Sequence, residues 1–145
     1  MTTRLNTNEQ RAIVITALRH ALPYLRVYKH KVFVLKAGGD AFVSNETTRG
    51  LMEQIGILHQ VGIRVVVVHG GGAMITDWLD RLRVTSEFVD GLRSTSAEAI
   101  EVVVAVLRGV INTQLVADIG KRGGRAAGLS GVDGGIVRAE RYDER

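Results

Sequence analysis

Apolar residues recur at the spacing of a helix in four segments of the chain. The first is TNEQRAIVITALRHAL, in which Thr7 and Gln10 have the spacing of a capping box. Pro23 follows this segment directly and should end or kink the helix. The second segment begins at about Asn45, and the third lies in residues 75–82. The pattern therefore predicts three helices ahead of a fourth, longer one.

The fourth helical segment is apolar on two faces. Thr95 and Glu98 have the spacing of a capping box, and the pattern continues to about Gly120. The first apolar stripe consists of Ile100, Val103, Val104, Leu107 and Ile111. The second consists of Val102, Val106 and Val110. We expect one face to pack on a sheet and the other to contact a second subunit.

Two apolar runs, each followed by glycines, predict strands. KVFVLKAGG leads into Gly38 and Gly39, and IRVVVVHGGG leads into Gly70, Gly71 and Gly72. Each strand precedes a helix, so the order is βαβα, which predicts an α/β fold with a mainly parallel sheet sandwiched by helices. The second run is continuously apolar, as expected of a central strand covered on both faces. Ligands of such sheets bind beyond the carboxyl ends of the strands, where both glycine runs fall.

The remaining segments contain turn signals. In SEFVDGLRST, Asp90 and Gly91 separate two short apolar-rich segments and predict a hairpin. GRAAGLSG and GGIVRAE are expected to form two short strands around Asp133 and Gly134. The chain has no internal repeat and no linker.

Composition narrows the function classes. The chain has 145 residues, enough for one domain with a core, and no cysteine, which excludes disulfides and thiol catalysis. No apolar run approaches the about 20 residues of a membrane span, and the N-terminus has no apolar signal region, so we expect a cytoplasmic protein without membrane contact. The net charge is +4, but the arginines are scattered and aromatics are few, which argues against nucleic acid and favours an anionic small molecule.

The glycine runs permit phosphate or carboxylate binding. Consecutive glycine N–H groups can converge on an anion, and a helix N-terminus adds a partial positive charge. Lys36 adds a cation at the first run. The alternatives are a tight strand-to-helix turn and an ordinary surface lysine. A P-loop is excluded because Ala73 and Met74 follow the glycines, and the dinucleotide fingerprint fails at Ile75.

Arg93 lies just after the predicted hairpin turn. An arginine at this position is normally a solvated surface charge. Its functional alternative is a bidentate contact to a substrate carboxylate.

Four segments in order, KAGGDAF, VVVVHGGGAMI, SEFVDGLRST and GKRGGRAAGLSGVDGG, resemble the acetylglutamate kinases of the amino acid kinase family over about residues 20–140. Such kinases use ATP and Mg²⁺ to phosphorylate the side-chain carboxylate of N-acetyl-L-glutamate in arginine biosynthesis. They are longer than this chain, and their ATP-binding half lies on the C-terminal side. The resemblance therefore implies a helical extension in residues 1–30 and an acetylglutamate-binding lobe in residues 31–145, inactive alone.

The resemblance also assigns roles to residues. Lys36 would contact the transferring phosphoryl group as the catalytic cation. Arg93 would hold the α-carboxylate of the substrate, with the hairpin at 85–95 as a lid. Backbone groups would bind phosphate at Gly38, Gly39 and Gly70, and would face substrate and transferred phosphate at Gly71 and Gly72. A carboxylate nucleophile is already ionised, so no general base is needed. His69 is expected to be a strand-end residue bonded locally.

The N-terminal helix resembles the extension of arginine-inhibited members, in which such helices interlace between dimers. This implies a homodimer or hexamer with arginine as a feedback inhibitor. The sequence departs from the family pattern at Asp40, Ala73, Met74 and Ser94, where asparagine, proline, glutamine and valine are usual. Two alternatives remain open: a non-catalytic regulatory module that binds an amino acid such as arginine, and a kinase of an aminoadipate derivative.

Overall fold

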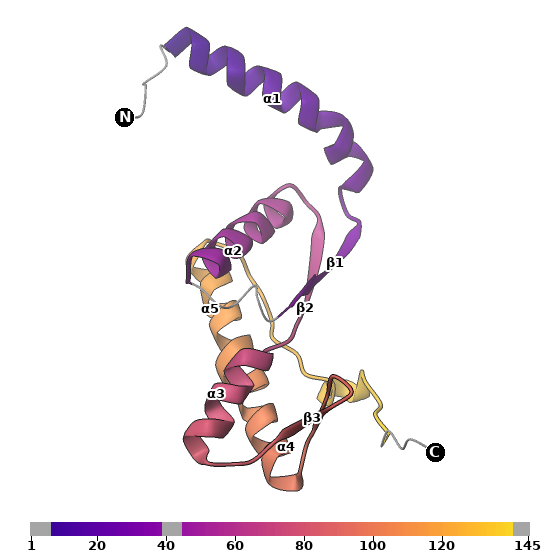
Figure 1. The fold of residues 1–145 in the computed structure, drawn as a ribbon. Helices are drawn as coiled ribbons and strands as arrows, with labels where there is room; N and C mark the ends of the chain where they lie inside the picture. Colours follow the sequence, from indigo (N-terminus) through magenta and orange to yellow (C-terminus); the bar gives the residue numbers. More distant parts are fainter. Residues whose placement is uncertain (1–6, 39–44, 141–145) are drawn as a thin grey trace.

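The structure is a computed structural model, and it describes residues 7–38 and 45–140. Along the chain, helices and strands alternate (Figure 1) in the order α1 (Thr7–Tyr28), β1 (Val32–Ala37), α2 (Asn45–Gln60), β2 (Arg64–His69), α3 (Gly72–Leu82), β3 (Glu87–Val89) and β4 (Leu92–Ser94). One long helix follows, made of α4 (Ala97–Val104), a π-helical segment η2 (Ala105–Asn112) and α5 (Thr113–Lys121). A short 3₁₀ turn, η3 (Asp133–Gly135), lies near the C-terminus.

Strands β1 and β2 form a parallel pair. Their register runs from Val32 opposite Arg64 to Ala37 opposite His69. The second pair, β3 and β4, is antiparallel and forms its own two-stranded sheet. The βαβ arrangement confirms the predicted α/β class, with parallel strands flanked by helices.

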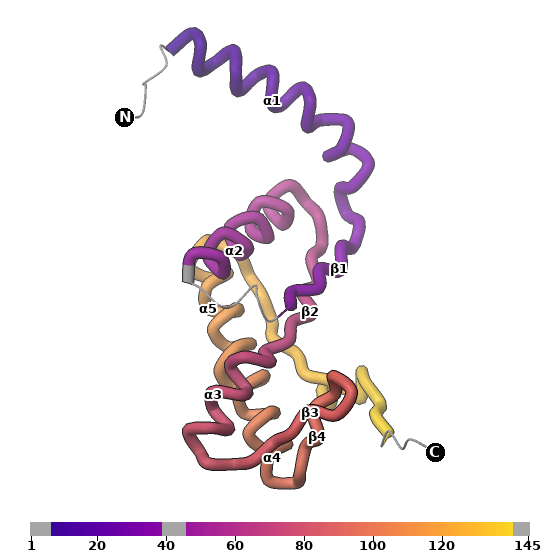
Figure 2. The backbone as a smooth tube through the Cα atoms, in the orientation of Figure 1, coloured from indigo at the N-terminus to yellow at the C-terminus, as the bar shows by residue number. Residues whose placement is uncertain are grey.

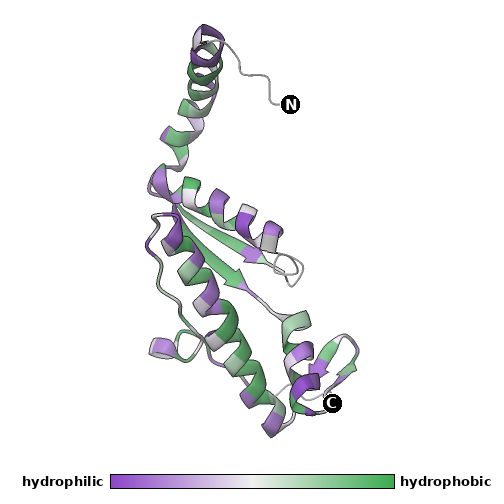
Figure 3. Ribbon diagram, turned by 90° about the vertical axis from the view of Figure 1, so that its left-hand side faces the viewer, coloured by the Kyte–Doolittle hydropathy of each residue, from purple (hydrophilic) through white to green (hydrophobic). Residues whose placement is uncertain are grey.

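The two faces of the parallel sheet have different surroundings. Leu35, Val65 and Val67 are half-buried and pack against the core that the helices form. The opposite face carries Val34 and Val66, which are 65% and 48% exposed. Figure 3 shows that both strands are apolar along most of their length. Within the described residues, the expectation that β2 is covered on both faces is therefore wrong, because the helices that pack on it lie on one side.

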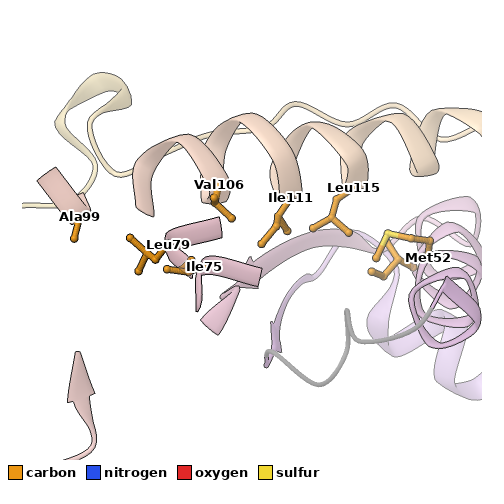
Figure 4. Close-up of a cluster of buried hydrophobic side chains, with 8 residues drawn as sticks. Met52, Ile75, Leu79, Ala99, Val106, Ile111 and Leu115 are labelled. Carbon is orange, nitrogen blue, oxygen red and sulfur yellow. The ribbon is translucent and has the colours of Figure 1, made fainter. Parts of the chain in front are cut away.

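The hydrophobic core lies where the long helix meets α2, α3 and the covered face of the sheet (Figure 4). Met52, Leu79 and Val106 are fully buried. Burial of such a side chain contributes about 1.5–3 kcal/mol. The remaining members of the buried cluster are Ile55, Ile75, Ala99, Ile111 and Leu115. The long helix thus packs one apolar face on the core, as predicted, but that face takes Val106 and Ile111 from the two different predicted stripes. Ile100 and Val104 of the first stripe are 47% and 53% exposed.

The long helix begins one residue later than its capping-box pattern indicated. Ser96 is the N-cap, and its Oγ accepts a hydrogen bond from the backbone N–H of Ala99 at 3.1 Å. The hydroxyl of Thr95 donates instead to the carbonyl of Arg93 at 3.1 Å, so the predicted Thr95–Glu98 box does not form. Two candidate caps were adjacent, and the second one has the required geometry.

By length and composition alone, the helix Ala97–Lys121 could cross a membrane, with a mean hydropathy of 1.6 in its most apolar window. Core helices of soluble proteins have the same composition. The side chains that this helix buries pack against α2 and α3.

Helix α1 stands apart from the rest of the chain, as Figure 2 shows. None of its residues is buried. It continues through Pro23 to Tyr28, so the proline does not end it. A proline inside a helix removes one backbone hydrogen bond, and an exposed helix can leave that carbonyl to water. The ring of Tyr28 meets that of Phe33 edge-on at 5.3 Å, which connects the end of α1 to β1.

The two strands expected around Asp133 are absent from the described residues. The carboxylate of Asp133 accepts hydrogen bonds from the N–H of Ser130 at 2.7 Å and from Arg108 at 3.1 Å. The N–H of Val137 donates to the carbonyl of Gly131 at 3.0 Å. These local bonds close a compact loop over residues 130–137. An Asp–Gly pair favours such a turn, and the flanking apolar residues form no ladder with a strand here.

Candidate functional site

The two glycine runs meet at one edge of the parallel sheet. Ala37 is paired with His69, and the N–H of Gly70 donates to the carbonyl of Ala37 at 3.3 Å. Gly38 and Gly70 therefore leave neighbouring strands side by side, as the βαβα pattern predicted. Gly39 and Asp40 lie outside the described residues. The structure thus places a bare backbone at the carboxyl end of both strands, where parallel sheets bind their ligands.

The three glycines after β2 have different surroundings. Gly71 is buried, and a Cβ on it would lie 2.3 Å from Cδ1 of Ile111 and 3.1 Å from Cδ2 of Leu107. A Cβ here would displace the ends of these two side chains, so the glycine lets the start of α3 approach the long helix closely. A Cβ on Gly70 or Gly72 would meet nothing within 4 Å. Packing therefore explains the glycine at 71, whereas the other two have open space in front of them.

The N-terminus of α3 has no side-chain cap. Gly71 occupies the N-cap position, and the first backbone bond of the helix runs from Ile75 to the carbonyl of Gly71 at 2.8 Å. The first N–H groups of a helix have no partner within it, and the helix dipole gives them a partial positive charge. With a glycine as the cap, these donors face outward at the edge where both glycine runs end. This arrangement can hold a phosphate or a carboxylate.

Arg93 reaches this helix N-terminus from the hairpin. Its Nη2 donates to Oγ1 of Thr76 at 2.7 Å and to the carbonyl of Gly72 at 3.4 Å. Its Nη1 donates to Oγ of Ser86 at 3.2 Å, and the guanidinium lies 4.5 Å above the ring of Phe88. Arg93 is therefore half-buried and held in one place, unlike the solvated hairpin arginine that its position alone suggested.

The hairpin turn directs Arg93 toward α3. Asp90 and Gly91 both have positive φ, 48° and 78°, which is the conformation of a type I′ turn. The turn joins strands of three residues each and places Phe88 opposite Arg93. The predicted hairpin is thus confirmed.

Lys36 lies in β1 opposite Val68, two residues before Gly38. Its side chain is exposed and follows the alternation of the open sheet face, whereas Ala37 and His69 point to the covered side. The structure therefore brings Gly38 and Gly70 to one edge of the sheet, with Lys36 just before it. It brings Arg93 to Gly72 at the start of α3, the helix that follows β2. Nδ1 of His69 lies 3.2 Å from the carbonyl oxygen of Gly70, the local contact that was expected.

Sequence reasoning did not identify Thr76 and Ser86, which hold the Arg93 side chain. The position of Thr76 could have indicated its role, because it lies four residues, about one helical turn, after Gly72 at the start of the helix. Among the residues that the structure describes, no group of three or more histidine, aspartate or glutamate side chains is arranged to hold a metal ion.

Residues 31–145 match the amino acid kinase family. The chain belongs to the amino acid kinase family. Its parallel strands flanked by helices agree with that family, so the expected fold family is confirmed.

Curated relatives narrow the resemblance. The chain is 47% identical to the acetylglutamate kinase of Campylobacter curvus over 119 residues, which are 82% of this chain and 42% of that protein. It is 44% identical to the acetylglutamate kinase of Clostridium beijerinckii over 139 residues, 96% of this chain and 47% of that protein. The chain thus spans less than half the length of the curated relatives it matches.

Solved structures agree on the fold. The N-acetylglutamate synthase of Neisseria gonorrhoeae, complexed with coenzyme A and N-acetyl-glutamate, superposes with a TM-score of 0.62 at 24% identity over 74% of this chain and 25% of that chain. A second structure, smu.665 from Streptococcus mutans, has a TM-score of 0.54 at 27% identity over 65% of this chain and 37% of that chain.

Proposed function

We propose that this chain supplies the substrate-binding part of an acetylglutamate kinase, which transfers a phosphoryl group from ATP to the side-chain carboxylate of N-acetyl-L-glutamate. The observation that carries the proposal is the position of Arg93, whose guanidinium lies beside the uncapped N-terminus of α3. One anionic group of a substrate can bind the arginine while another lies against the helix and glycine N–H groups. The similarity to acetylglutamate kinases supports a dicarboxylate with these two ends.

The chemistry needs alignment and neutralisation of charge. The nucleophile is a carboxylate, ionised at neutral pH, so no proton has to be removed. Backbone N–H groups at Gly38 and Gly72 can face the phosphates, because a Cβ on either glycine would meet nothing within 4 Å. The N–H of Gly70 already donates to the carbonyl of Ala37. Lys36 would neutralise charge on the transferring group. ATP, carrying Mg²⁺, would supply the phosphoryl group, and the glycine N–H groups and Lys36 would hold its phosphates.

The relatives are more than twice as long as the matched segment. We therefore propose that this chain binds the substrate but does not by itself catalyse phosphoryl transfer. We expect N-acetyl-L-glutamate to bind and ADP release to stay at the level of Lys36→Ala. ADP release clearly above that of the Lys36→Ala control would contradict this expectation.

The alternative is a regulatory module that binds an amino acid such as arginine without catalysis.

The exposed apolar residues of α1 favour assembly of several copies of the chain, since Leu18 is 55% exposed and Val27 61%. We propose that α1 and the outer face of the long helix contact further copies of the chain, giving a cytoplasmic dimer or hexamer, with arginine as its effector.

Calorimetric titration separates the two functions. The purified chain is titrated with N-acetyl-L-glutamate, glutamate and arginine, and the titration is repeated with Arg93→Ala. Arg83→Ala is the matched control, because it removes the same charge from the exposed far end of α3. Binding of N-acetyl-L-glutamate that disappears only in Arg93→Ala supports the kinase. Binding of arginine alone moves the protein to the regulatory class.

A further inference from the structure

Arg93 has two kinds of partner. Ser86 and Phe88 belong to the hairpin segment itself and would move with it. Thr76 and Gly72 belong to the first turn of α3. The 2.7 Å bond to Thr76 is the shortest of these contacts, and a short bond from a charged donor is a strong one.

The hydroxyl of Thr76 has both of its roles defined. It donates to the carbonyl of Gly72 at 3.0 Å and accepts from Nη2 of Arg93. Its orientation therefore follows from the helix backbone, and a lone pair is aimed at the guanidinium. The guanidinium of Arg93, the hydroxyl of Thr76 and the carbonyl of Gly72 thus form a small hydrogen-bond network at the start of α3. The Nε–H of Arg93 takes no part in these contacts and can bind an anion.

The hairpin has little else to hold it against α3. Phe88, Val89 and Leu92 are each about as exposed as surface residues, between 57% and 60%. Ser86 and Arg93 are the half-buried side chains of the segment 85–95. A hairpin of two three-residue strands is marginal by itself, so its placement depends on the contact that Arg93 makes with α3.

We propose that Thr76 is the positioning residue of Arg93. It holds the guanidinium, and with it the hairpin, at a fixed place beside the N-terminus of α3, so that the arginine and the helix N–H groups can bind the two anionic ends of one ligand. The part of this proposal that concerns N-acetyl-L-glutamate rests on the proposed function. The part that concerns the hairpin does not.

The first measurement is amide hydrogen exchange over residues 86–95 in the free protein. Thr76→Val removes the hydroxyl and keeps the branched shape, and Thr76→Ser keeps the hydroxyl as a conservative control. Loss of one hydrogen bond to a charged group predicts exchange about tenfold faster in Thr76→Val. Thr76→Ser should match the wild type, and exchange in α2 should stay unchanged in both. Equal exchange in wild type and Thr76→Val overturns the proposal.

The background Arg93→Ala separates positioning from a structural role of Thr76 in the helix. If Thr76 acts through Arg93, Thr76→Val adds nothing to the exchange rate of the Arg93→Ala protein. An additional acceleration in the double variant overturns the proposal.

Titration with N-acetyl-L-glutamate then tests the functional part. We expect affinity about tenfold weaker in Thr76→Val and near the wild-type value in Thr76→Ser. Wild-type affinity in Thr76→Val overturns the functional part. Absence of binding by the wild type contradicts the proposed function instead, and the exchange experiment still decides whether Thr76 positions Arg93.

Discussion

Gly71 lies directly against Ile111, so that a Cβ added to the glycine would come within 2.3 Å of Cδ1 of the isoleucine. The contact joins the start of α3 to the π-helical segment of the long helix. It also explains one of the three consecutive glycines without reference to a ligand. The turn that leads from β2 into α3 is therefore fixed by the hydrophobic core behind it.

Gly71→Ala should destabilise the protein by about 1–3 kcal/mol, the cost of overpacking a core. Replacing Ile111 by valine removes Cδ1, so Ile111→Val should recover part of the loss in a double variant. Gly72→Ala is the control, because a Cβ there meets nothing within 4 Å. Urea denaturation of the four proteins measures the effect. Equal destabilisation by Gly71→Ala and Gly72→Ala would show that the contact with Ile111 is not the cause.

The exposed face of the parallel sheet should tolerate polar residues. Val66 is 48% exposed, whereas its neighbour Val67 packs against the core. Val66→Thr keeps the β-branched shape and should change the free energy of unfolding by less than about 0.5 kcal/mol. Val67→Thr places a hydroxyl against the core and should cost at least about 1 kcal/mol. Thermal denaturation of the two variants tests which face is covered, and the reverse order would contradict the structure.

The hairpin turn depends on Gly91, whose φ is 78°. A residue with a side chain is disfavoured in the left-handed region by about 1–2 kcal/mol, so Gly91→Ala should loosen the hairpin. We expect faster amide exchange in residues 87–94 and weaker binding of N-acetyl-L-glutamate. Asp90→Gly serves as the control, since glycine accepts the positive φ of 48° at that position. Unchanged exchange in Gly91→Ala would rule out a type I′ turn.

The loop at 130–137 should open in acid. Hydrogen bonds from the N–H of Ser130 and, to a lesser extent, the charge of Arg108 hold the pKa of Asp133 below its ordinary value. A carboxyl group with a lowered pKa in the folded state stabilises that state above its unfolded pKa. This contribution is lost as the pH falls through the folded pKa. The contribution of Asp133 is therefore complete at neutral pH and declines below about pH 4.

The comparison of wild type with Asp133→Asn measures this contribution. The difference in Tm should be constant at neutral pH and should shrink as the pH falls below about 4. Glu140→Gln removes a carboxylate that makes none of these contacts and should show no such convergence. A Tm difference that grows in acid would give the opposite sign and contradict the assignment.

The periodicity of apolar residues predicted most of the helices and strands, because that pattern lies within each short segment of the sequence. The strands at β1 and β2, the helices and the hairpin at Asp90 and Gly91 all lie where the pattern indicated. Two of the errors arise because neighbouring residues compete for the same hydrogen bonds. Ser96 took the cap that Thr95 was expected to supply, and Asp133 drew Ser130 into a turn where strands were expected.

The sequence by itself determined the α/β order, the two glycine runs at strand ends and the resemblance to acetylglutamate kinases, since each of these follows from short segments read in order. Only the tertiary structure showed which glycine serves packing, which sheet face is open, and that Arg93 binds Thr76 beside α3. These features depend on contacts between residues that are far apart in the chain. Such contacts arise when the long helix and the hairpin close on α3, and no local pattern records them.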